Sequence, residues 1–89
     1  MLALITGASS GIGLEYAKQL ARDYHTDLLL VSNQEQEQKQ VASDLAANYG
    51  VKTTALYADL SKQDAAEQLH QYCLNNNLVV DILVNNAGV

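Results

Sequence analysis

Short apolar runs alternate along the chain with longer segments in which apolar residues recur at helical spacing. The apolar runs span residues 2–6, 28–32, 52–58 and 79–84. All of them except 52–58 are nearly continuous in apolar residues, which is typical of parallel strands buried on both faces. We therefore expect four strands of a parallel sheet.

The segments between these runs predict three helices, over about residues 12–24, 33–49 and 62–76. Gly50 is well placed to end the second helix in a left-handed conformation. The apolar positions expected at helical spacing are Ile12, Tyr16, Ala17, Leu20, Ala21 and Tyr24 in the first helix, Val41, Leu45 and Ala46 in the second, and Ala65, Leu69, Tyr72 and Cys73 in the third.

Strands and helices in the order β-α-β-α-β-α-β predict an α/β fold with a doubly wound parallel sheet of the Rossmann type. Right-handed crossovers place the helices on the faces of the sheet, and the doubly wound pattern gives the strand order 3-2-1-4. A ligand is expected beyond the carboxyl ends of the first and fourth strands, where the winding direction reverses.

The first strand runs into a glycine-rich turn that reads Thr6-Gly7-Ala8-Ser9-Ser10-Gly11-Ile12-Gly13. N–H groups at a helix start lack partners within the helix, and the helix dipole adds partial positive charge there, so such a turn suits a phosphate group. The glycines let the backbone approach a pyrophosphate, and the serines add hydroxyl donors. A purely structural turn is the alternative. The candidate phosphate-binding residues are Gly7, Ser9, Ser10, Gly11, Ile12 and Gly13, with the Ile12 side chain expected in the core.

A second motif, Asn85-Asn86-Ala87-Gly88, follows the fourth apolar run. The glycine spacing of the turn, G-x-x-x-G-x-G, differs from the G-x-G-x-x-G dinucleotide fingerprint. The two motifs in this order resemble the short-chain dehydrogenase/reductase family, whose members use a nicotinamide dinucleotide. The resemblance spans the whole chain but only the front part of the family's domain. It implies that residues 1–89 form the N-terminal part of one NAD(P)-binding Rossmann domain, with no second domain.

The resemblance also implies roles for residues after the third and fourth strands. Asp59 would accept a hydrogen bond from the adenine amino group, and Leu60 would supply a backbone N–H group. An alternative role for Asp59 lies in the turn before the third helix, since aspartate favours such turns. Asn85 is expected to brace the sheet. The residues expected near the adenosine ribose and the nicotinamide are Asn86 and Ala87, with Gly88 allowing the chain to turn.

The end of the second strand bears on the choice between NAD and NADP. An acidic residue ~20 positions after the glycines would bind the ribose 2′-hydroxyl group and repel a 2′-phosphate, but Ser32 and Asn33 stand there. The arginines that the family often uses for the 2′-phosphate are replaced by Ser10 and Asn33. Because Ser32 and Asn33 can hydrogen-bond a phosphate and carry no negative charge, they favour NADP over NAD as the cofactor.

Serine residues also stand before the second and third helices, each with an acidic residue three positions later. Ser32 with Glu35, and Ser61 with Asp64, match the capping-box pattern, in which both side chains satisfy N–H groups of the helix start. Capping the second helix is thus an alternative to cofactor binding for Ser32.

Composition and charge exclude several classes of function. The 89 residues include 10 acidic and 5 basic side chains, for a formal net charge of −5, which argues against binding to nucleic acid or an anionic membrane. No apolar stretch approaches the ~20 residues that span a bilayer, and the first run lacks the basic start of a signal peptide, so a cytoplasmic location is expected. Cys73, the single cysteine, is expected to be a buried thiol. His25 and His70 have no partners at metal-ligand spacing, so no metal site is expected.

The resemblance implies an NAD(P)-dependent oxidoreductase that transfers hydride between the nicotinamide and a small carbonyl or alcohol substrate, and a full-length protein that is a homo-oligomer. The family uses a Tyr-x-x-x-Lys pair with an assisting serine, and none of the five tyrosines here has lysine four positions later. No catalytic residue is therefore assigned, and we expect the 89 residues to be inactive alone, as the cofactor-binding front of a longer enzyme. The alternative is a stand-alone dinucleotide-binding module or remnant without catalysis.

Overall fold

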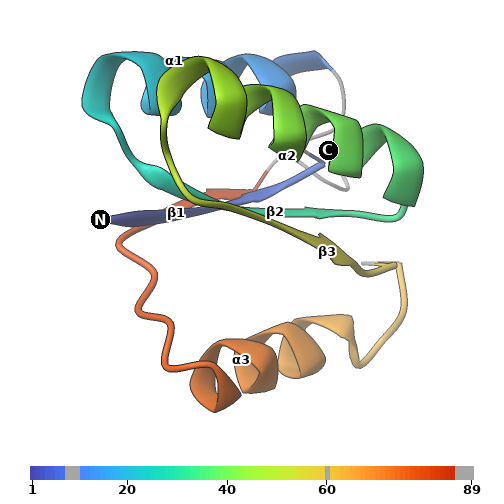
Figure 1. The fold of residues 1–89 in the computed structure, drawn as a ribbon. Helices are drawn as coiled ribbons and strands as arrows, with labels where there is room; N and C mark the ends of the chain where they lie inside the picture. The colour runs from blue at the N-terminus through green and yellow to red at the C-terminus, as the bar shows by residue number, and fades with distance from the viewer. Residues whose placement is uncertain (8–10, 60, 86–89) are drawn as a thin grey trace.

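A parallel β-sheet separates two helices on one face from a third helix on the other (Figure 1). The computed structural model describes residues 1–7, 11–59 and 61–85. The sheet order β3-β2-β1-β4 confirms the doubly wound fold expected from the sequence. In chain order the elements are β1 (Leu2–Thr6), α1 (Gly11–Tyr24), β2 (Asp27–Ser32), α2 (Glu35–Tyr49), β3 (Thr53–Tyr57), α3 (Ala65–Asn75) and β4 (Ile82–Asn85).

The strand register aligns the carboxyl ends of the four strands along one edge of the sheet. Thr6 at the end of β1 lies opposite Val31 on one side and Asn85 on the other. Ser32 at the end of β2 lies opposite Tyr57 at the end of β3. Because all pairs are parallel, every segment that leaves a strand toward its helix starts from this edge, which is where the sequence predicts a ligand.

Apolar side chains on both faces of the sheet explain why helices cover both of its faces. The central strand β2 is buried on both faces, as its continuous apolar run predicts. Beneath α1 and α2 one core cluster contains Ile5, Leu28 and Leu30, and the small residues Ala17 and Ala21 let α1 approach the sheet closely. The cluster on the α3 face is made of Leu4, Leu29, Val31 and Cys73.

The first helix differs in part from the inner face expected for it. Ala17 and Ala21 are buried, but Ile12 is 67% exposed, and Tyr16 and Tyr24 are exposed as well. The expectation that the Ile12 side chain enters the core was therefore wrong. In the first turn of α1 only Gly13 is buried.

The starts of α2 and α3 also differ from the capping boxes expected. Gln34, not Ser32, occupies the N-cap position of α2, while the Ser32 hydroxyl oxygen accepts a hydrogen bond of 3.0 Å from the Gln34 N–H group. Asp64, not Ser61, precedes α3, and it makes no side-chain cap. The reason at α3 is a competing partner, because Ser61 donates to Asp59 and remains in the preceding turn.

The end of α2 agrees with the sequence. Gly50 adopts a left-handed conformation with φ 69°, and its N–H group donates to the backbone oxygen of Ala46 at 3.0 Å. This geometry satisfies one of the last carbonyl groups of the helix. Gly50 lies between α2 and β3, at the edge of the sheet opposite the expected ligand site.

Gln38 occupies an inner position of α2 that helical spacing would give to an apolar residue. Its side chain is 1% exposed, and its Nε2 group donates a hydrogen bond of 2.9 Å to the backbone oxygen of Leu56 in β3. Its Oε1 atom is buried without a hydrogen-bond partner among the described residues. An unpaired buried acceptor costs about 1–3 kcal/mol, whereas one hydrogen bond contributes about 0.5–1.5 kcal/mol. The glutamine therefore gives the fold no clear gain in stability over an apolar side chain.

Candidate dinucleotide-binding site

The carboxyl edge of the sheet gathers the candidate residues from segments far apart in the sequence. The described candidates follow β1, β2 and β3, whose ends are aligned by the parallel register. They are Gly7, Gly11, Ile12, Gly13, Ser32, Asn33 and Asp59. The candidates that lie outside the described residues are Ser9, Ser10, Leu60, Asn86, Ala87 and Gly88.

The structure describes the three glycines of the glycine-rich turn, and two of them have a left-handed backbone conformation. Gly7 has φ 65° and donates its N–H group to the backbone oxygen of Val31 at 2.8 Å. Gly11 has φ 62°, and a Cβ atom placed on it would meet no atom within 4 Å among the described residues. Gly13 is buried, and the first turn of α1 carries no acidic residue that would oppose an anion. Open space at the positive end of a helix fits a phosphate group.

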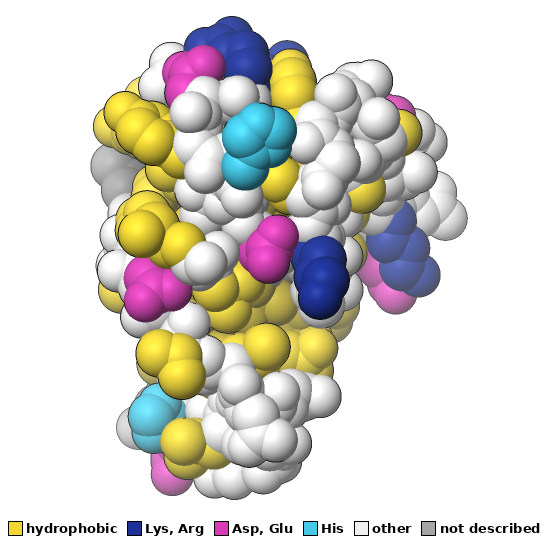
Figure 2. Space-filling view, turned by 60° about the vertical axis from the view of Figure 1, so that its left-hand side comes forward, with side chains coloured by type: hydrophobic (Ala, Val, Ile, Leu, Met, Phe, Trp, Pro, Cys, Tyr) yellow, Lys and Arg dark blue, Asp and Glu magenta, His cyan; other side chains and the backbone are white. Residues whose placement is uncertain are grey.

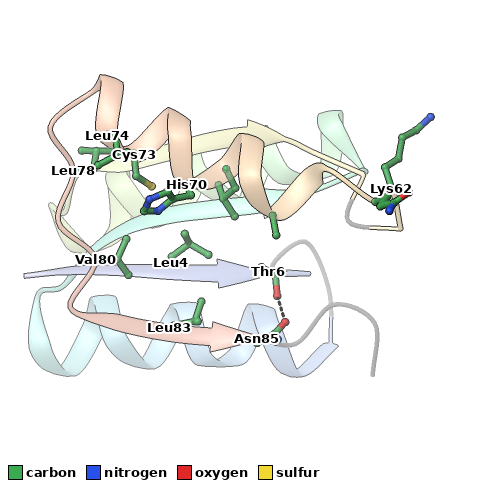
Figure 3. Close-up of a pocket in the computed structure, with 13 residues that line it drawn as sticks. Leu4, Thr6, Lys62, His70, Cys73, Leu74, Leu78, Val80, Leu83 and Asn85 are labelled. Atoms are coloured by element: carbon green, nitrogen blue, oxygen red, sulfur yellow. Dashed lines mark hydrogen bonds between the residues drawn. The ribbon is translucent and has the colours of Figure 1, made fainter.

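Two side chains hold the ends of β1 and β4 together beside this turn. The Thr6 hydroxyl group donates to Oδ1 of Asn85 at 3.2 Å and lies 3.4 Å from the backbone oxygen of Val84 (Figure 3). Thr6 is buried, so this contact fixes the strands where the winding direction of the sheet reverses. The bond agrees with the bracing role expected for Asn85.

The end of β2 presents one buried and one exposed candidate. Ser32 is buried, and its hydroxyl oxygen accepts the Gln34 N–H group, so it shapes the turn into α2. Asn33 is exposed and carries no charge. The nearby Lys39 forms an ion pair of 3.2 Å with Glu35 within α2. Asn33 is thus the candidate whose side chain is open to a ligand.

Asp59 follows β3 and takes part in a tight turn. Its Oδ1 atom accepts the Ser61 hydroxyl group at 2.6 Å and the Ser61 N–H group at 3.1 Å. These hydrogen bonds hold the pKa of the Asp59 carboxyl group below its ordinary value of 3.8. At neutral pH the group is an ionised acceptor. Its Oδ2 atom has no hydrogen-bond donor in the described part of the chain and is available to a ligand.

An open cavity of about 680 Å³ lies between α3 and the strands β1 and β4 (Figure 3). Figure 2 shows hydrophobic side chains gathered in the recess between the main body and the part that carries α3. None of the cofactor candidates within residues 1–7, 11–59 and 61–85 lines this cavity, whereas Thr6 and Asn85, at the carboxyl ends of β1 and β4, do. Its lining is mainly apolar and includes Leu4, Leu69, Leu74, Leu78, Val80 and Leu83. The cavity is therefore mainly apolar, unlike the glycine turn, and it reaches the carboxyl ends of β1 and β4 at Thr6 and Asn85.

Other expected features concern cysteine, metals and membranes. Cys73 is a free thiol in the core, as expected, and burial raises its pKa above the ordinary value. Over residues 1–7, 11–59 and 61–85, the structure contains no cluster of three or more His, Cys, Asp or Glu side chains that could hold a metal ion. No helix in that same part of the chain is both long and apolar enough to cross a bilayer.

Sequence reasoning missed two contacts that shape this edge. The sequence marks Thr6 only as the last residue of a strand, and its bond to Asn85 depends on strand pairing that the sequence does not display. Gln38 had a detectable signal, because it stands three, four and seven positions before the inner residues Val41, Ala42 and Leu45. That spacing places the glutamine on the inner face of the helix, where a buried polar side chain is expected to have a hydrogen-bond partner.

Comparison with known proteins assigns the whole chain to one family. A family model described as short chain dehydrogenase matches residues 1–89. The chain is 36% identical over 86 residues to a very-long-chain 3-oxoacyl-CoA reductase from Lodderomyces elongisporus, covering 97% of this chain and 24% of that protein. It is 34% identical over 87 residues to the enzyme of the same name from Anas platyrhynchos, covering 98% of this chain and 27% of that protein.

Solved structures share the arrangement of strands and helices. A short-chain dehydrogenase from Sphingobium yanoikuyae in complex with NADPH has a TM-score of 0.87 and 39% identity, covering 99% of this chain and 34% of that one. The L-sorbose reductase from Gluconobacter frateurii, complexed with NADPH and L-sorbose, has a TM-score of 0.89 and 32% identity, covering 99% of this chain and 33% of that one. The chain spans about a quarter of the length of the curated relatives. The chain therefore belongs to the short-chain dehydrogenase family, whose model matches all 89 residues, and the observed sheet order agrees with this assignment.

Proposed function

We propose that the carboxyl edge of this sheet binds a nicotinamide dinucleotide, with its pyrophosphate over the turn from Gly7 to Gly13. The observation that carries the proposal is the open space at Gly11, at the start of a helix and beside the point where the sheet reverses direction. A side chain at Gly11 would occupy the space that the pyrophosphate needs. Ser9 and Ser10 would add hydroxyl donors.

The adenosine half of the cofactor is proposed to lie across the ends of β2 and β3. Asp59 would accept the adenine amino group through Oδ2, since Oδ1 is held by Ser61. Leu60 would contribute its N–H group. Asn33 would face the ribose 2′ position, with Ser32 shaping the turn behind it. The nicotinamide and its ribose would follow toward Asn86, Ala87 and Gly88.

NADP is the proposed cofactor in preference to NAD. Asn33 carries no charge that would repel a 2′-phosphate, and NADPH is bound in the dehydrogenase from Sphingobium yanoikuyae and in the L-sorbose reductase. Neither Ser32 nor Asn33 neutralises a phosphate, so the preference is expected to be modest.

The proposed reaction of the whole protein is hydride transfer between the nicotinamide and a carbonyl or alcohol. The bound cofactor would supply the hydride, and this segment would bind and orient it. This chain is 36% identical to a relative named for 3-oxoacyl-CoA, 36% identical to one named for bulky ketones and 32% identical to one named for L-sorbose. We therefore propose that the segment does not select the substrate, and the common feature of these names is a carbonyl compound. We assign no proton-transferring residue to the 89 residues, which are proposed to bind the cofactor without catalysing the reaction.

A matched pair of glycine substitutions tests the proposal. Gly11→Ala and Gly50→Ala place a methyl group at backbones of nearly equal conformation, φ 62° and 69°, and neither methyl meets an atom of the described residues within 4 Å. Backbone strain is thus similar, but only Gly11 lies at the proposed cradle. Calorimetric titration of the purified chain with NADPH is expected to show binding that Gly11→Ala abolishes and Gly50→Ala retains. Equal affinity in all three proteins would overturn the assignment.

A further inference from the structure

Gln38 connects the two segments that flank the proposed adenosine site. Its backbone N–H group donates to the oxygen of Gln34 at 3.0 Å, next to Asn33, and its side chain donates to the oxygen of Leu56 at 2.9 Å. Leu56 stands three residues before Asp59. One buried side chain therefore links the start of α2 to the end of β3.

Further hydrogen bonds join the same two segments, and together with the Gln38 bond they form what we call the frame: Ser32, Gln34 and Gln38 on one side and Leu56 and Ala58 on the other. The Ala58 N–H group donates to the backbone oxygen of Ser32 at 3.1 Å, and the Ser32 hydroxyl oxygen accepts the Gln34 N–H group. Along the chain, Asn33 directly follows Ser32, and Asp59 directly follows Ala58. A shift of the Leu56 carbonyl group relative to α2 would change the distance between the two residues proposed to contact adenosine.

Stability does not explain why a glutamine occupies this position. The surrounding inner residues of α2, Ala42 and Leu45, are apolar, and Gln38 buries an Oε1 atom that has no partner among the described residues. An unbranched apolar side chain of the same length would fill the same space without burying a polar atom. The hydrogen bond from Gln38 fixes the position of the Leu56 carbonyl group relative to α2, although the Oε1 atom of Gln38 is buried without a partner among the described residues.

We propose that Gln38 is a positioning residue for the adenosine half of the cofactor: through Leu56 it holds Asp59 in register with Asn33. The inference rests on the proposed dinucleotide binding and names a determinant of that site that does not touch the ligand itself. Gln38 is buried, so its effect reaches the cofactor only through the ends of β2 and β3.

The structure offers a matched control on the same pair of elements. The Thr53 hydroxyl group donates to the backbone oxygen of Ala42 at 2.8 Å, so it also connects β3 with α2. Thr53 begins β3, at the edge of the sheet opposite Asp59. Gln38→Met and Thr53→Val each remove one such hydrogen bond with little change of shape, but only the first removes it beside the proposed site.

The probe is 2′,5′-ADP, which carries the adenosine and the 2′-phosphate without the nicotinamide. Titration of the 89-residue chain is expected to show about a 3- to 10-fold loss of affinity in Gln38→Met, the range that one hydrogen bond supports. Thr53→Val is expected to bind within about twofold of the unmutated chain. The melting temperature of Gln38→Met should be equal or higher, and that of Thr53→Val lower.

A second measurement reports on the frame without any ligand. Amide hydrogen exchange at Ala58 and Ser61 is expected to become faster in Gln38→Met and to stay unchanged in Thr53→Val. Equal affinity of Gln38→Met and the unmutated chain for 2′,5′-ADP would overturn the role of Gln38 and leave dinucleotide binding intact. Equal losses in both variants would overturn it too, since the effect would then be general loosening. Absence of binding by the unmutated chain would overturn the proposed function and this inference together.

Discussion

The hydroxyl group of Thr6 donates a hydrogen bond of 3.2 Å to Oδ1 of Asn85, which joins the ends of β1 and β4. These two strands lie side by side although 79 positions separate the bonded residues. Each strand continues directly into one of the two motifs that identify the family. The bond therefore holds together the two strand ends from which these motifs start, at the point where the winding direction of the sheet reverses.

Thr6→Val is expected to lower the free energy of unfolding by about 0.5–1.5 kcal/mol, because a similar shape is kept while one hydrogen bond is lost. Affinity for NADPH is expected to fall as well, since the ends of β1 and β4 would separate more easily. Urea unfolding and calorimetric titration of the same preparations measure the two effects.

Thr26→Val is the control for that substitution. Thr26 is also buried, but its hydroxyl group has no hydrogen-bond partner among the described residues, and it lies between α1 and β2, away from the carboxyl edge. Removing an unpaired buried hydroxyl group is expected to leave stability unchanged or to raise it, with NADPH affinity unaffected. A similar loss of stability in both variants would show that the Thr6–Asn85 bond contributes nothing.

The sequence was sufficient for the order of elements and the topology of the sheet. Continuous apolar runs such as 28–32 occur where strands are buried on both faces, and β2 is buried in this way. The prediction that ligand candidates collect at one edge followed from parallel pairing alone. Gly50 was also predictable, because its left-handed conformation is a local property of the helix end.

Features decided by competition between partners were not predictable. Ser61 has the sequence pattern of a helix cap, but the Asp59 carboxylate is two residues away and takes its hydroxyl group instead. Ile12 has helical spacing, but the first turn of α1 leaves its side chain exposed. The contact of Thr6 with Asn85 depends on the pairing of distant strands, which no local pattern contains. The helical spacing of Gln38 indicates an inner position, but not its partner in β3.

Asp59 is expected to make the stability of the chain depend on pH in the acid range. Its pKa in the folded state is below the ordinary value of 3.8, chiefly because of the Ser61 hydroxyl group. A depressed carboxyl pKa stabilises the fold above the unfolded-state value, and that contribution is lost as pH falls through the folded-state value. The difference in unfolding free energy between the unmutated chain and Asp59→Asn should be constant above about pH 5 and shrink as pH falls below 3.8.

Removal of the Ser61 hydroxyl group tests the cause of that dependence. When Ser61 is replaced by Ala, the change with pH in the difference in unfolding free energy between the proteins with and without Asp59→Asn is expected to be smaller. The reason is that the main hydrogen bond to the Asp59 carboxylate is gone. An unchanged difference would mean that another group depresses the pKa of Asp59.

Asn33→Asp is expected to shift cofactor preference from NADP toward NAD. Asn33 is exposed after β2, so a carboxylate there would face the proposed 2′-phosphate and repel it, while it would accept a hydrogen bond from a 2′-hydroxyl group. A tenfold change in the ratio of the two affinities corresponds to about 1.4 kcal/mol, which is within reach of one such charge.

Ser43→Asp adds the same charge at an exposed position farther along α2 and should leave the ratio unchanged. Dissociation constants for NADPH and NADH, measured at one ionic strength, give the comparison. Strong NAD preference in the unmutated chain would refute the proposed preference for NADP.

Leu83→Lys is expected to reduce self-association of the 89-residue chain. Leu83 is 64% exposed in β4, which pairs with β1 alone among the described strands, and it lines the apolar cavity beside α3. An unpaired edge next to exposed apolar side chains favours association, and an edge lysine opposes it. Sedimentation velocity should show that the unmutated chain associates as its concentration rises and that Leu83→Lys associates less.

Tyr24→Lys, at a position 73% exposed at the end of α1, is the control and should associate like the unmutated chain. An unmutated chain that stays monomeric at high concentration and melts in one sharp transition would contradict this expectation.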